Sequence, residues 1–143
     1  MLLVDVNVLV HAFREDAEDH HRYAAWLGGL MHGDQSFGIA DWVLSGFLRV
    51  VTHPKIFDPP SDISVALKFA EDVRACPHSV RVAPGPRHWE IFSQLCQLPG
   101  IRGNLVPDAY LAALAIESGH EWATTDRDFS RFPGLKCRHP LQP

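Results

Sequence analysis

The feature that most constrains the fold is a short apolar run, residues 2–4, that ends in a single carboxylate, Asp5. A run this short and this apolar is typical of a strand buried in a parallel sheet. In open α/β sheets the functional side chains lie just beyond the carboxyl ends of the strands. Asp5 occupies such a position, and burying its carboxylate is costly unless a cation holds it. The alternative is that Asp5 simply caps the helix that follows.

The composition indicates a globular chain without a specialised partner surface. We predict that residues 1–143 form a single domain, since the chain has 143 residues. The net charge of −4 gives no overall basic footprint, so a nucleic acid would have to meet a local basic face or bind through metal ions. We expect no membrane association and no export, because no apolar run approaches about 18 residues and no signal peptide is apparent. The three widely spaced cysteines suit reduced thiols in the cytoplasm.

Apolar periodicity and turn residues divide the chain into alternating strands and helices. Strands are expected at residues 2–4, 36–40 (a strand or a connector), 79–83, 121–124 and 135–138. Helices are expected at residues 7–13, 42–52 (with Asp41 as the N-cap), 63–75 (capped by Ser61 or Asp62) and 88–98. Two further helices are expected: one opens at Asp16 or at residues 18–19 and ends at 33–34, and the other runs from Pro107, at its first helical position, to Gly119. The alternation predicts a three-layer α/β/α domain with a central parallel sheet of four or five strands, its order centred on the first strand.

Acidic side chains are expected to meet at one edge of this sheet. Asp126 follows a strand as Asp5 does, and Asp108 lies at the second position of a helix whose following apolar residues put it on the inward face. Together with Asp128, these carboxylates would repel one another unless a cation lay between them. Oxygen ligands favour Mg²⁺ or Mn²⁺ over zinc. Taken singly, Asp108 is also explained as a first-turn helix acid, and Asp126 and Asp128 as turn acids.

Four segments carry a family resemblance that spans essentially the whole chain: residues 4–9 (VDVNVL), 43–50 (VLSGFLRV), 105–113 (LVPDAYLAA) and 124–129 (TTDRDF). In this order they resemble the PIN-domain ribonucleases, and within them the VapC toxins of bacterial VapBC toxin–antitoxin pairs. The resemblance implies that the acids of the site are Asp5, Asp108, Asp126 and Asp128. It assigns supporting polar positions to Asn7 and Thr124.

One position departs from the family pattern. The family usually has Glu after the residue that matches Ser45, and this chain has Gly46 there. A glycine in the middle of a helix costs roughly 1 kcal/mol relative to alanine, so its presence needs an explanation. The loss of a metal ligand at this position would explain the glycine. The same loss puts the usual four-acid site in doubt. Ser45 or Asp41 could act through water instead, although Asp41 is better explained as a helix cap.

The resemblance implies an Mg²⁺- or Mn²⁺-dependent endoribonuclease, the toxin of a toxin–antitoxin pair, that cleaves RNA phosphodiesters by a metal-activated water. The metal ligands would be Asp5, Asp108 and Asp126. The implied partners are RNA, a VapB-type antitoxin and a second copy in a homodimer. We expect the antitoxin in a groove near the exposed-looking stripe of Tyr23, Trp26 and Leu30, although such a stripe more often belongs to the core. Basic residues that could position RNA are Lys55, Arg102, Arg127 and Arg131.

Two competing interpretations stay open at this point. The first is a haloacid-dehalogenase-like phosphatase, which also begins with Asp after an apolar strand. That class needs a second Asp two residues later, and Asn7 stands there. The second is a PIN domain that has lost a ligand at Gly46 and now only binds RNA or an antitoxin. A metal titration compared with an RNA cleavage assay discriminates between the enzyme and the binding module.

Overall fold

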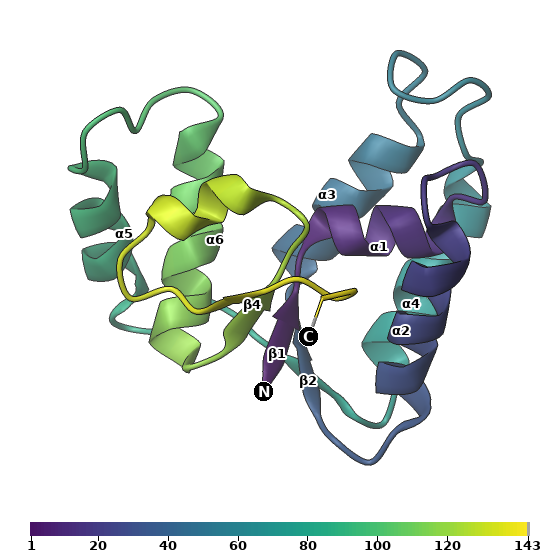
Figure 1. The fold of residues 1–143 in the computed structure, drawn as a ribbon, viewed down its shortest axis with the longest axis horizontal. Helices are drawn as coiled ribbons and strands as arrows, with labels where there is room; N and C mark the ends of the chain where they lie inside the picture. Colours follow the sequence, from purple (N-terminus) through teal and green to yellow (C-terminus); the bar gives the residue numbers. More distant parts are fainter. Residues whose placement is uncertain (143) are drawn as a thin grey trace.

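The computed structural model describes residues 1–142, and its centre is a five-stranded sheet in the order β3-β2-β1-β4-β5 (Figure 1). All four strand pairs are parallel. The strands are β1 (Leu2–Val4), β2 (Phe37–Ile39), β3 (Ser79–Arg81), β4 (Glu121–Ala123) and β5 (Cys137–Arg138). Pro143, the last residue of the predicted domain, lies outside the described residues.

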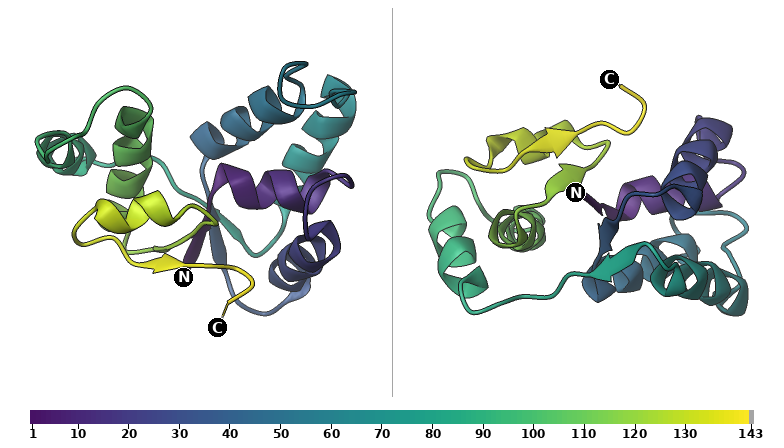
Figure 2. Two further views of the ribbon diagram at one scale, coloured as in Figure 1. Left: turned by 45° about the horizontal axis from the view of Figure 1, so that its top comes forward. Right: turned by 90° about the horizontal axis from the view of Figure 1, so that it is seen from below.

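Six α-helices of the described chain flank the sheet: α1 (Val6–Phe13), α2 (His20–His32), α3 (Asp41–Val51), α4 (Ile63–Ala75), α5 (His88–Cys96) and α6 (Leu105–Ser118). A short 3-10 helix, η1 (Arg127–Arg131), follows β4. Figures 1 and 2 show α1 to α4 on one side of the sheet and α5 and α6 on the other. Across residues 1–142, no helix is long and apolar enough to cross a membrane. The predicted α/β/α architecture with the first strand at its centre is confirmed.

The central position of β1 explains its apolar sequence. Leu3 and Val4 are fully buried, and β1 pairs with β2 on one side and β4 on the other. The ladder with β4 continues one residue past the strand, because the Asp5 backbone N–H donates to the Ala123 carbonyl at 3.0 Å. Parallel pairing brings the carboxyl ends of β1 and β4 to the same edge of the sheet. Residues that directly follow these two strands are therefore neighbours, as the sequence predicts.

Two helix starts differ from the prediction. Helix α6 begins at Leu105 after Asn104, so Asp108 is its fourth residue and not its second. Pro107 is tolerated there because the first four N–H groups of a helix have no intrahelical partner. Asp41 is not the N-cap of α3, since Ala40 takes that position without a side-chain cap.

The Asp41 carboxylate forms an ion pair with the Arg74 guanidinium of α4 instead, with an Nε–Oδ1 distance of 2.8 Å. This hydrogen bond lowers the pKa of Asp41 below its ordinary value. A bond to the neighbouring helix thus replaces the local cap that the sequence suggested. The other predicted cap is confirmed, since the Asp62 side chain accepts from the Ser64 backbone N–H at the start of α4.

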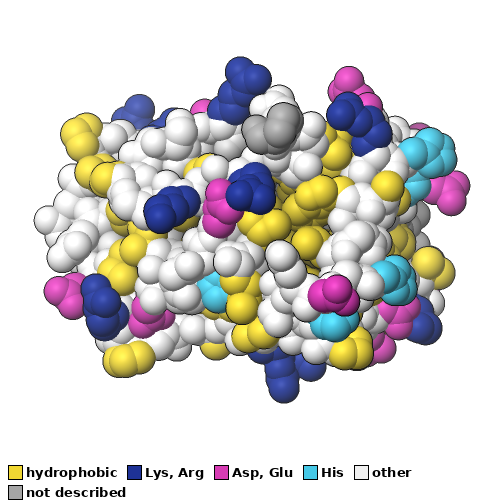
Figure 3. All heavy atoms as spheres, turned by 60° about the horizontal axis from the view of Figure 1, so that its bottom comes forward, with side chains coloured by type: hydrophobic (Ala, Val, Ile, Leu, Met, Phe, Trp, Pro, Cys, Tyr) yellow, Lys and Arg dark blue, Asp and Glu magenta, His cyan; other side chains and the backbone are white. Residues whose placement is uncertain are grey.

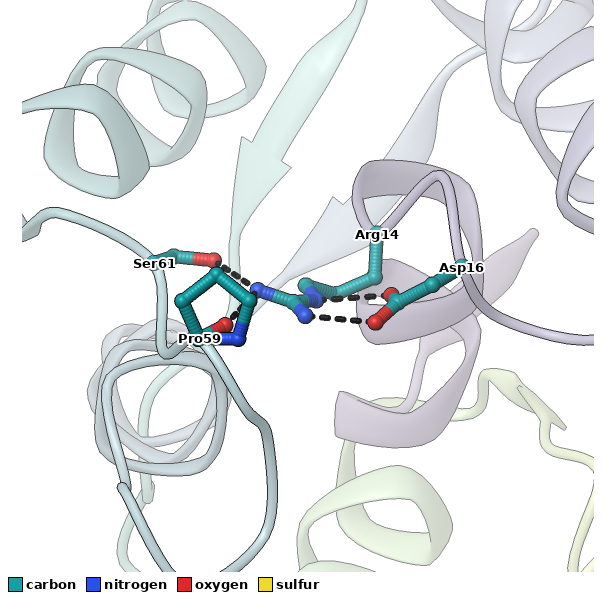
Figure 4. A network of polar contacts seen from close by, with 4 residues as sticks. All are labelled: Arg14, Asp16, Pro59 and Ser61. Carbon is teal, nitrogen blue, oxygen red and sulfur yellow. Dashed lines mark hydrogen bonds and ion pairs between the residues drawn. The ribbon is translucent and has the colours of Figure 1, made fainter.

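Arg14, directly after α1, connects α1 to the loop that precedes α4 (Figure 4). Its guanidinium forms a two-point contact with Asp16 at 2.9 and 2.6 Å. It also donates to the Pro59 carbonyl at 2.9 Å and to the Ser61 hydroxyl at 3.0 Å. The same group lies 4.2 Å from the centre of the Phe57 ring. Only 11% of the Arg14 side chain is exposed, although its partners Asp16 and Pro59 lie at the surface.

Replacing Arg14 by Ala should lower the free energy of unfolding by about 1–3 kcal/mol, because a largely buried guanidinium and its hydrogen bonds to Asp16 and to the loop are lost. Urea unfolding measured by circular dichroism gives this number. Arg22→Ala is the matched control, since that arginine is 60% exposed and lies 3.7 Å from Asp19. The control should change stability by less than about 0.5 kcal/mol. Equal unfolding midpoints for the two variants would contradict this role of Arg14.

Candidate functional site

A pocket of about 570 Å³ opens at the carboxyl edge of the sheet. It brings together three of the predicted acids: Asp5 at the end of β1, Asp108 in the first turn of α6, and Asp126 after β4. Asn7 of α1 and Ser45 of α3 also line it. The order of strands in the sheet thus gathers side chains from both ends of the chain into one space.

The Asp5 carboxylate is almost fully buried, with 4% of the residue exposed, and it accepts hydrogen bonds on both oxygens. Oδ1 accepts from the Val6 backbone N–H at 2.6 Å, which caps the start of α1. Oδ2 accepts from the Thr124 hydroxyl at 2.7 Å and from the Asn7 side-chain amide at 3.2 Å. Asp5 is therefore both the helix cap and a pocket residue, so the two alternatives drawn from the sequence hold together.

Thr124 and Asn7 extend this network to Asp126. The Thr124 hydroxyl accepts from the Asp126 backbone N–H at 3.0 Å, and the Asn7 carbonyl oxygen accepts from the Thr125 N–H at 3.2 Å. The ends of β1 and β4 are joined by these side chains as well as by the sheet. Both side chains therefore hold neighbouring groups in position, and their supporting role in function stays a prediction.

Asp128 stands apart from the other three acids. It lies in η1, its side chain is 65% exposed, and it is not among the residues that line the pocket. Its backbone N–H donates to the Asp126 carboxylate at 2.8 Å, and its own carboxylate lies 3.8 Å from Arg131. In this structure Asp128 therefore orients Asp126 through its backbone, while its carboxylate faces solvent.

Burial and repulsion between carboxylates raise the pKa values of two acids of the pocket, Asp5 and Asp108. Burial raises the pKa of Asp5 from 3.8 to about 6, against the hydrogen bonds from Thr124 and Val6, and repulsion from Asp108 and Asp126 adds to the rise. The pKa of Asp108 is also raised, first by burial and then by repulsion from Asp126 and Asp128, with Arg131 opposing. The pocket therefore concentrates negative charge that a cation would stabilise.

The donor chemistry of the pocket fits a hard divalent cation. Carboxylate oxygens are the ligands that Mg²⁺ and Mn²⁺ prefer, and Asp5, Asp108 and Asp126 present such oxygens to the same pocket. Within residues 1–142, no three acidic, histidine or cysteine side chains lie close enough together to hold a metal by themselves. Mg²⁺ normally keeps several waters and shares its coordination with substrate phosphates, so two or three separated carboxylates suffice.

One wall of the pocket is a stripe of α3. Gly46 lies on it together with Trp42, Ser45, Arg49 and Val50. The helical spacing of these positions puts them on one face. A Cβ at Gly46 would lie 3.1 Å from a methyl group of Val6, so α1 and α3 approach closely here. The glycine thus permits close helix packing and also leaves this wall without a carboxylate.

The pocket residues that sequence reasoning missed include His11, Trp42 and Arg49. Trp42 and Arg49 share the helical stripe of Gly46, so the periodicity of that helix could have revealed them once Gly46 was assigned to the site. His11 offered no such signal, because it lines the pocket from the far end of α1.

The basic residues expected to position RNA were Lys55, Arg102, Arg127 and Arg131. None of them is among the described residues that line the pocket.

The stripe expected to bind an antitoxin is less exposed than its sequence suggests. Tyr23 is buried, with its ring stacked on His11 at 4.8 Å, so the expectation of an exposed stripe is wrong for this residue. Trp26 and Leu30 are partly buried and pack against the core. Helix α2 lies against α1 and must cover its apolar face, which explains this orientation.

Comparison with known proteins agrees with the geometry. The PIN domain family model matches residues 2–135. A VapC ribonuclease of Mycobacterium bovis is 43% identical over 141 residues, covering 99% of this chain and 96% of that protein. Ribonuclease VapC25 of Mycobacterium tuberculosis is 39% identical over 140 residues, covering 98% of this chain and 99% of that protein. The fold is similar to that in the crystal structure of VapBC2 from Rickettsia felis bound to a promoter DNA fragment, with a TM-score of 0.69, 17% identity and 96% coverage of both chains. Its sequence and its fold together show that the chain belongs to the PIN-domain family and, within it, to the VapC ribonucleases.

Proposed function

We propose that this chain is an endoribonuclease that depends on Mg²⁺ or Mn²⁺ and acts as the toxin of a VapBC-type pair. The observation that carries the proposal is the single pocket shared by Asp5, Asp108 and Asp126 in a chain of this family. These three carboxylates would hold the cation. When bound, the cation supplies charge neutralisation at a phosphodiester and lowers the pKa of a water molecule.

The protein groups around the acids have distinct tasks in this proposal. Thr124 and Asn7 orient the Asp5 carboxylate through their hydrogen bonds, and the bond from Thr124 opposes the rise of its pKa that burial causes. Arg49 lines the same pocket and supplies a cationic contact for the RNA backbone. Gly46 and Ser45 leave the α3 wall open, so the phosphate has room to approach.

RNA binding in this proposal is local and not spread over the surface. The net charge is −4, and on the face drawn in Figure 3 acidic, basic and histidine side chains are interspersed. Electrostatic attraction must therefore come from the cation and a few arginines near the pocket. Weak dependence of RNA affinity on salt is expected, because few phosphates are contacted.

We also propose the partners that the family implies. A VapB-type antitoxin binds the chain, the chain forms a homodimer, and the pair acts in the cytoplasm. The structural similarity to the VapBC2 complex supports the choice of antitoxin. The antitoxin groove stays a prediction, and Trp26 and Leu30 offer more surface to it than Tyr23 does.

Asp5→Asn and Asp108→Asn should each reduce RNA cleavage by roughly 100-fold or more, because each removes a charge that holds the cation and thereby several kcal/mol of charge stabilisation. Cleavage of a single-stranded RNA is followed on a gel with Mg²⁺ or Mn²⁺ present. Asp72→Asn is the control, since that acid is 54% exposed and pairs with Lys68 on α4. Undiminished cleavage by both pocket variants would refute the proposed function.

The stability of the metal-free protein should depend on pH through Asp5. Its folded-state pKa of about 6 lies above the ordinary 3.8, so the folded protein holds the proton more tightly. Its contribution is fully present below about pH 3.8 and is lost as the pH rises through about 6, a loss of about 3 kcal/mol. Urea unfolding in EDTA between pH 4 and pH 8 measures it as the difference between wild type and Asp5→Asn. A constant difference across this range would show that Asp5 is not the group responsible.

Gly46→Glu should strengthen metal binding, because it returns a carboxylate to the wall that faces the other acids. The 3.1 Å approach to Val6 offsets part of the helix stabilisation expected from replacing glycine. Gly46→Ala isolates that steric effect and should leave metal affinity unchanged. Calorimetric Mn²⁺ titration and RNA cleavage are compared for wild type and both variants. Cleavage by Gly46→Glu alone would mean that the wild-type chain has lost its nuclease activity.

A further inference from the structure

A second hollow lies beside the acidic pocket and shares a wall with it. It has a volume of about 350 Å³ and is lined by residues that include Asp41, Trp42, Arg81, Pro84 and Tyr110. Trp42 lines both spaces, so a bound polymer that extends from one space into the other passes next to this side chain. The volume lies at the lower end of the range of ligand sites, about 300–1,000 Å³, which suits a single small aromatic group.

The Trp42 ring is exposed and yet held in place. Fifty-seven per cent of the residue is accessible, so a bound group can reach its ring. Its ring centre lies 5.2 Å from that of Tyr110 on α6 at an interplanar angle of 36°. Tyr110 is in turn supported by His88 of α5, whose ring lies edge-on at 4.4 Å. His88 is buried, and its Nε2–H donates to the Tyr110 carbonyl at 3.0 Å.

The charges around this hollow favour a nucleotide. Arg81 contributes an exposed guanidinium at the end of β3, and within residues 1–142 it forms no ion pair. Asp41 is the acid that lines the hollow; its carboxylate forms an ion pair with Arg74, and the charge of Arg81 also lowers its pKa. A stacking surface with an exposed cation beside it is the combination that holds single-stranded nucleic acid.

We propose that this hollow is a subsite for one nucleobase of the RNA substrate, adjacent to the phosphodiester that lies in the acidic pocket. The base stacks on Trp42, and Arg81 contacts the neighbouring backbone phosphate. This inference rests on the proposed ribonuclease function and adds to it a positioning residue outside the acidic set. Single-stranded RNA suits the site because its unpaired bases are free to stack on aromatic side chains.

Stacking on Trp42 determines which part of the RNA strand enters the site, and the acidic pocket alone does not. Carboxylates and a cation bind phosphate groups, and every nucleotide has the same phosphate, so they do not fix which part of the strand enters. A base held on Trp42 fixes the strand on one side of the scissile bond. Because Tyr110 and His88 already support the ring, little conformational entropy is lost when the base binds.

The test measures binding of a short fluorescein-labelled single-stranded RNA in EDTA, where no metal-dependent cleavage occurs. Trp42→Ala should weaken binding by about tenfold, the usual effect of removing one stacked base contact. Trp42→Phe keeps an aromatic face and should retain most of the affinity. Trp89→Ala is the matched control, because Trp89 is 71% exposed on α5 and lines neither space. It should bind as the wild type does.

A series of RNAs, each with one abasic position, separates stacking from a structural effect. One abasic position should weaken binding to the wild type by a similar factor and should have no further effect on Trp42→Ala. RNA should also quench tryptophan fluorescence in the wild type, and Trp42→Phe should lose this quenching. Equal affinity of wild type and Trp42→Ala, or independent losses from the abasic position and the substitution, would overturn the subsite.

The outcomes also distinguish this inference from the function on which it rests. If the wild type neither binds RNA in EDTA nor cleaves it with Mg²⁺, the ribonuclease proposal fails and the subsite with it. If the wild type binds and cleaves RNA while Trp42→Ala binds equally well, only the subsite fails. A loss of affinity that is equal for Trp42→Phe and Trp42→Ala would also reject stacking.

Discussion

The buried carboxylate of Asp5 is the interaction on which the rest of the site depends. One oxygen accepts the first free N–H of α1, and the other accepts the Thr124 hydroxyl that follows β4. The same side chain therefore starts a helix and joins the ends of two parallel strands. The Thr124 hydroxyl also accepts from the Asp126 backbone N–H, so the network that starts at Asp5 reaches a second acid of the pocket.

Burying the Asp5 carboxylate costs free energy of folding, and a role in binding a cation would explain why an acid stands there. Burial raises the pKa of Asp5 to about 6, and Asp108 and Asp126 add repulsion. A structure selected only for stability would use an uncharged side chain here, since a buried charge is expensive. Strongly perturbed acids in a cleft are typical of functional sites, and a divalent cation would turn the repulsion into attraction.

Helix α3 joins the acidic pocket to its surroundings. Gly46 lets α1 approach within contact of α3, and on the same stripe Trp42 and Arg49 face the opening. Trp42 also borders the hollow that contains Arg81 and Tyr110. Acidic, aromatic and basic groups thus lie next to one another on a small surface. This arrangement suits the phosphates and bases of a bound polynucleotide strand.

The sequence by itself determined the parallel α/β/α fold, the central place of the first strand, and the gathering of Asp5, Asp108 and Asp126, because strand alternation and apolar periodicity are local properties. It did not determine the pairing of Asp41 with Arg74, since that partner is distant in sequence, and it placed the start of α6 two residues too late. Only the tertiary structure turned Asp128 to solvent, Tyr23 inward against His11, and Trp42 outward between two hollows. The physical reason is that a side chain's direction follows from which helix packs over it, and that packing is settled only when the whole chain is assembled.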